Sequence, residues 1–170
     1  MQNPMLVEKA MLEYTELLFR IAYYYLKDKQ LSEDIVQEVF IKFYCSNYQE
    51  HGELKAYLSK MTANTCKDYL KSWSYKKILI QNKLFLKETT IHKDSLVETD
   101  ELTTLDSAIL SLPLKQREAI VYYYLENLTI KEVSQMVNSP ESTVKSRLKS
   151  GKELLKKKLV HEDWEVLLHE

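Results

Sequence analysis

The chain has 170 residues, of which 45% are hydrophobic, and a formal net charge of −1; this length suffices for one ordinary domain or two small ones. It contains only two glycines, Gly52 and Gly151, where average usage of about 7% would give roughly a dozen, so glycine-rich phosphate-binding and dinucleotide-binding loops are excluded. Few glycines and three prolines also leave too few turn residues for a many-stranded β protein, and the chain is predicted to be all-α.

Three amphipathic helices are predicted in the N-terminal part of the chain, over about residues 7–25, 32–46 and 54–73. Ser32 is predicted to be the N-cap of the second helix, because Glu33 and Asp34 follow it in the first turn, where the helix dipole favours acidic side chains. A polar loop, residues 47–52, separates the second helix from the third.

On the second predicted helix, Asp34, Gln37 and Glu38 share the face opposite the apolar stripe. Paired carboxylates can perform acid–base catalysis, but no histidine, serine elbow or glycine-rich loop accompanies this pair. The three residues are therefore predicted to form an interaction surface for a basic or mixed partner. The chain is not expected to be an enzyme, and no catalytic residue is assigned.

The third predicted helix presents a polar stripe formed by Lys60, Asn64, Lys67 and Lys71. The segment 54–77 carries six lysines against one acidic residue, a net charge of +5. Trp73 and neighbouring tyrosines alternate with the lysines, and this combination suits single-stranded DNA, because bases stack on aromatic rings while lysines meet phosphates. The alternative is that the aromatic side chains belong to the core.

Residues 76–103 balance five lysines against five acidic residues and keep no long apolar period. They are predicted to be a linker with a short helix over about residues 78–86. At the other end of the chain, residues 161–170 form an acidic tail with several apolar side chains, which is expected to pack or dock as a short amphipathic segment.

Residues 104–160 are predicted to form a second helical unit. Thr129 and Glu132 have the spacing of a capping box, and Asn138 is expected to adopt the left-handed conformation that ends the helix they open. Ser139 is predicted to cap the next helix, with Pro140 at its first position. A helix, a turn of about three residues and a second helix form the layout of a helix-turn-helix.

Apolar residues at intervals of three and four mark the buried face of the last predicted helix, and Gly151 on that face is expected to permit close helix packing. The segment 143–158 carries seven basic residues against one acidic residue, a net charge of +6. The basic face of an amphipathic helix, taken alone, is more often simply exposed to solvent than bound to DNA. A capped helix and a tight turn before it favour DNA, with short hydroxyl side chains at the start of the helix in the major groove and later lysines on phosphates.

Cysteine and histidine usage gives no sign of a redox or metal centre. Cys45 and Cys66 lie 21 positions apart without a CxxC motif, and inert, partly buried thiols are favoured over a redox pair. The four histidines are scattered, so no metal site and no cofactor are expected. The chain also lacks an apolar run long enough for a signal peptide or a membrane span, and a cytoplasmic location is expected.

Three blocks of sequence resemble the bacterial sigma factors of the extracytoplasmic-function class, the small two-domain members of the sigma-70 family. The first block is Ser32–Phe40, which resembles the family's polymerase-binding helix. The second is Leu54–Leu58 with Ala63, Asn64 and residues 67–70, which resembles the helix that binds the minus-ten promoter element. The third comprises Leu112–Glu118, Leu128, Thr129 and Pro140–Leu148, which resembles the helix-turn-helix that binds the minus-thirty-five element.

The resemblance implies three groups of site residues. The residues that would bind the polymerase core are Asp34, Gln37 and Glu38. Those that would bind the melted minus-ten strand, with a flipped base held in the loop 48–52, are Tyr48, His51, Lys60, Asn64, Lys67, Lys71 and Trp73. Those that would bind the minus-thirty-five duplex are Ser142, Thr143, Lys145, Ser146, Arg147, Lys149 and Lys152. Three residues depart from the family pattern: Asn138 stands in place of the usual turn glycine, Ser142 in place of a common glycine, and Ser150 where a basic residue is frequent.

The same resemblance implies the organisation and the partners of the chain. Residues 1–75 would form a region 2-like domain, 76–103 the linker, 104–160 a region 4-like helix-turn-helix domain and 161–170 the tail. The expected partners are RNA polymerase core, promoter DNA as duplex and as melted strand, and a cognate anti-sigma factor, either free or membrane-bound, with no small-molecule substrate. Two other readings stay open: a stand-alone helix-turn-helix regulator, and a helical adaptor with no role on DNA.

Overall fold

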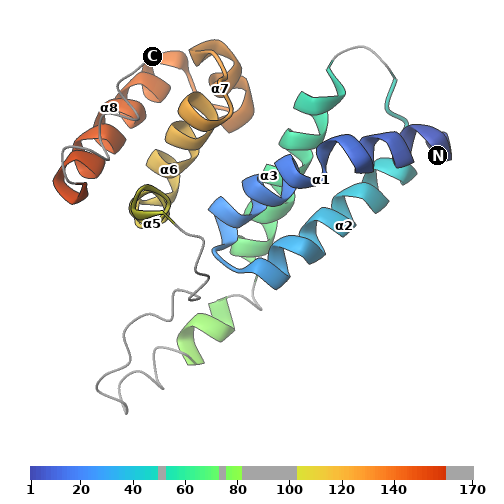
Figure 1. Ribbon diagram of the computed structural model, residues 1–170, viewed down its shortest axis with the longest axis horizontal. Helices are drawn as coiled ribbons and strands as arrows, with labels where there is room; N and C mark the ends of the chain where they lie inside the picture. The colour runs from blue at the N-terminus through green and yellow to red at the C-terminus, as the bar shows by residue number, and fades with distance from the viewer. Residues whose placement is uncertain (50–52, 73–75, 82–102, 160–170) are drawn as a thin grey trace. The chain divides into compact units, whose positions relative to one another are not determined.

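The computed structural model describes residues 1–49, 53–72, 76–81 and 103–159, and within these ranges the regular secondary structure is helical (Figure 1). The all-α prediction is confirmed for this part of the chain. The chain divides into two compact units, Met1–Thr99 and Asp100–Glu170. No helix among the described residues is both long and apolar enough to cross a membrane.

In the described part of the first unit, three long helices form a bundle in which each packs against the other two. The helices are α1 (Pro4–Leu26), α2 (Lys29–Cys45) and α3 (Leu54–Lys71). Their facing apolar stripes meet in a core whose most deeply buried side chains include Leu18, Ile21, Val39, Phe43 and Leu58. Each such side chain contributes about 1.5–3 kcal/mol of hydrophobic stabilisation relative to an exposed one, which fixes the direction in which the polar faces point.

The second helix starts one turn earlier than predicted, and the assignment of Ser32 as its N-cap is wrong. Asp28 is the N-cap, and its side chain accepts a hydrogen bond from the Leu31 backbone N–H at 2.8 Å. Ser32 lies inside the helix, fully buried, and its hydroxyl donates to the Asp28 carbonyl at 2.6 Å. Aspartate and serine are equally good N-caps. Residues 29–31 are already helical, so the cap lies before them, at Asp28.

The second unit packs α6 and α7 against the long helix α8. Its elements are α5 (Thr104–Leu110), α6 (Leu114–Ile120), the π-helical turn η1 (Val121–Leu125), α7 (Ile130–Val137) and α8 (Glu141–Lys158). The Arg117 guanidinium is buried in this unit and donates to the Leu112 carbonyl from Nε at 3.3 Å and from a terminal nitrogen at 2.8 Å. These bonds satisfy a carbonyl between α5 and α6 that the end of a helix leaves unpaired.

The turn η1 interrupts the regular α-helical hydrogen bonding after α6. The Glu126 N–H donates to the Val121 carbonyl, five residues back, at 3.0 Å. Asn127 follows with a positive φ of 53°, which turns the chain toward α7. Wide turns of this kind are rare and occur mostly as single turns inside longer helices.

The helix-turn-helix of α7 and α8 is confirmed. Thr129 and Glu132 form the predicted capping box, with the Thr129 N–H donating to Glu132 Oε2 at 2.7 Å. Asn138 closes α7 in the left-handed conformation, with φ 50° and ψ 51°. The assignment of Ser139 as the next N-cap is wrong: Pro140 occupies that position, and the Ser139 hydroxyl donates back to the Val137 carbonyl at 3.3 Å. Because Pro140 has an extended backbone, α8 begins one residue later than expected.

Several expectations fall at the edges of the described residues. The third helix ends at Lys71 instead of residue 73, and residues 73–75 lie outside the described part. Helical backbone is present over residues 76–81, where a short linker helix was expected from 78, while residues 82–102 also lie outside. The acidic tail from residue 161 is likewise not described.

Candidate nucleic-acid and partner interfaces

The exposed face of α2 carries the three predicted partner-binding residues together. Asp34, Gln37 and Glu38 are all exposed, because the opposite side of the helix is buried against α1 and α3. The Gln30 side-chain amide donates to Asp34 Oδ1 at 3.3 Å. The apolar residue Ile41, one turn after Gln37, is 64% exposed on the same face. The surface therefore combines carboxylates, an amide and an apolar side chain.

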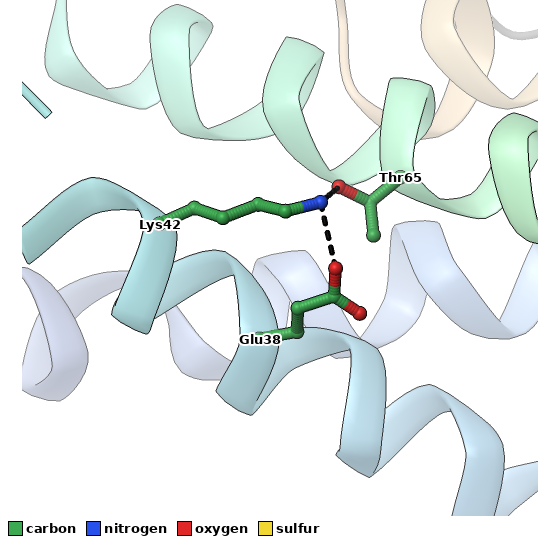
Figure 2. Close-up of polar contacts among 3 residues, drawn as sticks. All are labelled: Glu38, Lys42 and Thr65. Carbon is green, nitrogen blue, oxygen red and sulfur yellow. Dashed lines mark hydrogen bonds and ion pairs between the residues drawn. The ribbon is translucent and has the colours of Figure 1, made fainter. Parts of the chain in front are cut away.

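A polar bridge joins this face of α2 to α3 (Figure 2). The Lys42 ammonium forms an ion pair with Glu38 Oε1 at 2.7 Å and donates a hydrogen bond to Thr65 Oγ1 at 3.2 Å. The sequence interpretation did not include Lys42, although a glutamate four residues before a lysine on a helix is a recognised stabilising pair. The contact with Thr65 depends on how the two helices pack and has no counterpart in the local sequence.

A groove of about 1060 Å³ lies between α1 and α2 beside Gln37. The apolar side chains that line it include Met11, Leu12, Phe19, Val36, Phe40 and Ile41. Leu12, part of the apolar pattern of the first helix, is 85% exposed here. An apolar groove with polar residues at its rim is typical of surfaces that bind another protein.

The predicted stripe of α3 lies on one face of the helix. Lys60, Asn64 and Lys71 are exposed. Lys67 is half-buried, and its ammonium lies 5.8 Å from the centre of the Tyr25 ring in α1. This cation–π contact holds Lys67 against the bundle.

Tyr48 belongs to an aromatic cluster at the start of the loop between α2 and α3. Its ring centre lies 4.6 Å from that of Tyr57 and 5.8 Å from that of Phe43. The Gln2 side chain donates to the Tyr48 carbonyl at 3.0 Å, which ties the loop to the N-terminus. His51 and Trp73, the other aromatic residues predicted on this surface, lie outside the described residues.

The faces of α8 are divided as the periodicity predicts. Val144, Leu148, Gly151 and Leu155 are buried. On the opposite side the exposed residues are Ser142, Lys145, Ser146 and Lys149, and those of intermediate exposure are Thr143, Arg147 and Lys152. The Ser146 hydroxyl donates to the Ser142 carbonyl at 3.1 Å, so its oxygen stays available as an acceptor. The Lys152 ammonium lies 5.4 Å from the centre of the Tyr124 ring.

The two cysteines lie in different environments, and the expectation that both are partly buried is wrong. Cys45 is exposed near the end of α2, whereas Cys66 is buried in α3. Burial raises the pKa of the Cys66 thiol from 9.0 to about 12, because the apolar surroundings disfavour the thiolate. Within the described residues, no group of three or more histidine, cysteine, aspartate or glutamate side chains could hold a metal ion.

Comparisons with known proteins agree across both units. The family model described as Sigma-70 region 2 matches residues 11–74, and that described as Sigma-70, region 4 matches residues 102–155. The chain is 31% identical over 147 residues to the ECF RNA polymerase sigma factor SigM of Bacillus subtilis (strain 168), covering 84% of this chain and 88% of the relative. It is 27% identical over 158 residues to SigW of the same organism, an ECF RNA polymerase sigma factor, covering 86% and 84%.

Solved structures show the same fold at low sequence identity. CnrH in complex with the cytosolic domain of CnrY has a TM-score of 0.64 and 14% identity, covering 92% of this chain and 88% of that one. The sigma factor RpoE of Bartonella quintana, in complex with the anti-sigma factor NepR, has a TM-score of 0.62 and 18% identity, covering 88% and 94%.

Proposed function

The chain belongs to the sigma-70 family of RNA polymerase sigma factors, in its extracytoplasmic-function class. We propose that the polar faces of α2, α3 and α8 bind, respectively, the polymerase core, the minus-ten strand and the minus-thirty-five duplex. It is an alternative sigma factor, which binds the RNA polymerase core and directs promoter-specific transcription initiation. It acts as an initiation factor and not as an enzyme, and in our proposal it works in the cytoplasm.

The observation that carries the proposal is the basic face of α8 in a capped helix-turn-helix. Two short hydroxyl side chains, Ser142 and Ser146, stand at its exposed N-terminal end, where a recognition helix meets base edges. Lys145 and Lys149 are exposed on the same side and can neutralise phosphates. In this proposal α8 binds the minus-thirty-five duplex, with Thr143, Arg147 and Lys152 at the edges of the contact.

The first unit would supply the other two contacts. The stripe of α3, with Asn64 between lysines, suits a melted minus-ten strand, because an amide can hydrogen-bond an unstacked base while ammonium groups meet phosphates. The α2 face of Asp34, Gln37 and Glu38 would bind the polymerase core. The two surfaces lie on different helices, so a substitution in one can be expected to spare the other.

An anti-sigma factor is the remaining partner in the proposal. RpoE was solved in complex with the anti-sigma factor NepR, and CnrH in complex with the cytosolic domain of CnrY. The apolar groove between α1 and α2 opens beside Gln37. A partner that filled this groove would also cover the proposed polymerase surface, and this would silence the protein.

In vitro transcription tests the proposal. Fragmented genomic DNA is transcribed by sigma-free polymerase core with and without the protein, and the transcript starts are sequenced. Protein-dependent starts that share two spaced upstream motifs are expected, and the Glu38→Lys variant should remove them. If the protein binds duplex DNA tightly without core, and Glu38→Lys leaves its function intact, the chain acts instead as a stand-alone regulator.

A further inference from the structure

Lys42 occupies a position between two surfaces that the proposed function assigns to different partners. Its ammonium contacts Glu38, four residues before it on α2, and Thr65, which belongs to α3 (Figure 2). We propose that Lys42 is a positioning residue, which holds the Glu38 carboxylate in the geometry that binds the polymerase core. This inference rests on the proposed role of Glu38.

The contact with Thr65 makes this ion pair different from an ordinary surface pair. The side chains of Lys42 and Glu38 are 45% and 50% exposed, and exposed pairs of this spacing usually leave both long side chains mobile. Thr65 is only 6% exposed, and its branched side chain has few rotamers. A hydrogen bond to this fixed hydroxyl restrains the ammonium, and the ammonium in turn restrains the carboxylate.

The bridge leaves Glu38 able to bind a partner. Lys42 contacts Oε1, and an ionised carboxylate has two oxygens that can accept several hydrogen bonds. A donor of the polymerase can therefore bind Glu38 while the bridge stays intact. Because the glutamate is already ordered, binding does not have to immobilise it, and this saving corresponds to between about two- and tenfold in affinity.

The same arrangement connects the two faces of the first unit. Thr65 directly follows Asn64, which is exposed on the proposed DNA-binding stripe of α3. The position of the Glu38 carboxylate thus depends on the packing of α3 against α2 and not on α2 alone. Full affinity for the polymerase core therefore requires that α3, the helix proposed to bind DNA, is correctly packed against α2.

The test is a double-mutant cycle on the full chain, with its dissociation constant for purified polymerase core as the readout. Lys42→Met keeps the length of the side chain without the charge, and Thr65→Val keeps the shape without the hydroxyl. Each should weaken core binding between about two- and tenfold. Thr65→Ser, which keeps the hydroxyl but lacks the branch that fixes it, should bind the core more tightly than Thr65→Val. Lys9→Met, at an exposed lysine of α1, should bind like the unaltered protein.

The cycle is completed in the Glu38→Ala background, where Lys42→Met and Thr65→Val should have no further effect on core binding. Thermal unfolding of each variant shows whether the bundle is intact. Unchanged or tighter binding by Lys42→Met overturns the inference, as does a loss that persists without Glu38, which would mean that Lys42 contacts the polymerase directly or supports the fold. If Glu38→Ala itself binds core normally, the proposed role of Glu38 fails first, and the positioning role fails with it.

Discussion

Gly151 of α8 lies so close to Ile120 of α6 that a Cβ on the glycine would lie 2.9 Å from Cγ1 and 3.2 Å from Cδ1 of the isoleucine. Ile120 is fully buried, and because protein interiors are close-packed, a shift of its side chain is costly. A glycine inside a helix costs about 1 kcal/mol relative to alanine. Its presence here is explained by the close approach of the two helices and not by contact with DNA.

Gly151→Ala is therefore expected to destabilise the second unit by about 1 kcal/mol, because overpacking of about 1–3 kcal/mol exceeds the gain in helix propensity. Urea unfolding followed by circular dichroism measures this. Glu153→Ala, an exposed change in the same helix, should stay within about 0.5 kcal/mol of the unaltered protein. Stabilisation by Gly151→Ala would mean that the helices separate at little cost.

Replacement of Asn138 by glycine is expected to preserve the stability of the protein, whereas replacement by alanine is expected to lower it. Its φ of 50° lies in the left-handed region, where a Cβ costs roughly 1 kcal/mol and asparagine is less penalised than most residues. Asn138→Ala should lower the unfolding free energy by about 1 kcal/mol, while Asn138→Gly should match or exceed the unaltered protein. Thermal melting compares the three proteins, and equal melting temperatures would contradict the assigned turn.

The lysines of α8 should govern the salt dependence of duplex binding. If Lys145 and Lys149 each neutralise a phosphate, replacing either by alanine should reduce the slope of log affinity against log salt by about 0.9. Fluorescence anisotropy of holoenzyme on promoter duplex at several salt concentrations gives the slope. Lys9→Ala, on α1, serves as the control, and an unchanged slope in both α8 variants would remove this helix from the interface.

Asn64→Ala and Glu38→Lys should separate the two functions of the first unit. Asn64 is exposed on α3, so its loss should impair strand opening at the promoter and leave core binding intact. Glu38→Lys places a cation on the face of α2 that is proposed to bind the polymerase, and it should abolish core binding. Permanganate footprinting measures opening, and native gel electrophoresis measures core binding. Identical defects in both variants would point to misfolding of the bundle.

Burial of Cys66 should make stability fall at alkaline pH. The unfolded thiol ionises above its ordinary pKa of 9.0, whereas in the folded protein the pKa is raised to about 12. Between these values the unfolded state binds fewer protons, so the free energy of unfolding decreases as pH rises, by up to about 1.4 kcal/mol per pH unit. Cys66→Ala should show a shallower decline between pH 9 and 10.5 in urea unfolding.

Thiol labelling gives an independent check on the same residue. Exposed Cys45 should react with a disulfide reagent at pH 8, and Cys66 only when the bundle opens. Equally rapid reaction of both thiols would contradict the burial of Cys66.

The features that the sequence predicted best are those decided by neighbouring residues. The capping box of Thr129 and Glu132 and the left-handed Asn138 involve hydrogen bonds within one turn, so residue type and spacing are sufficient. The N-cap assignments of Ser32 and Ser139 are wrong because several neighbouring residues can stand at the N-terminus of a helix, and residue type alone does not decide among them. Ser32 instead lies inside α2 and is fully buried.

The features that the sequence could not predict arise from packing between distant segments. The bridge from Lys42 to Thr65 joins residues 23 positions apart and needs the crossing of α2 and α3. The groove between α1 and α2 could not be predicted from the sequence either. Leu12 follows the same helical spacing as the buried leucines of α1, although it is exposed. Only the packed bundle distinguishes an apolar side chain in the core from one left on the surface.

The widened turn η1 has a consequence for how the length of the chain can vary. A residue removed from an α-helix rotates everything after it by about 100°. A π-helical turn already holds one residue more than α-helical geometry requires, so losing Tyr123, which is only partly buried, would restore ordinary bonding and leave the orientation of α7 unchanged. A deletion inside α8 would instead rotate the lysines that follow it away from the face proposed to bind DNA. Residues 121–125 are thus a point in the second unit where a single-residue deletion can be absorbed without changing the direction of α7 and α8.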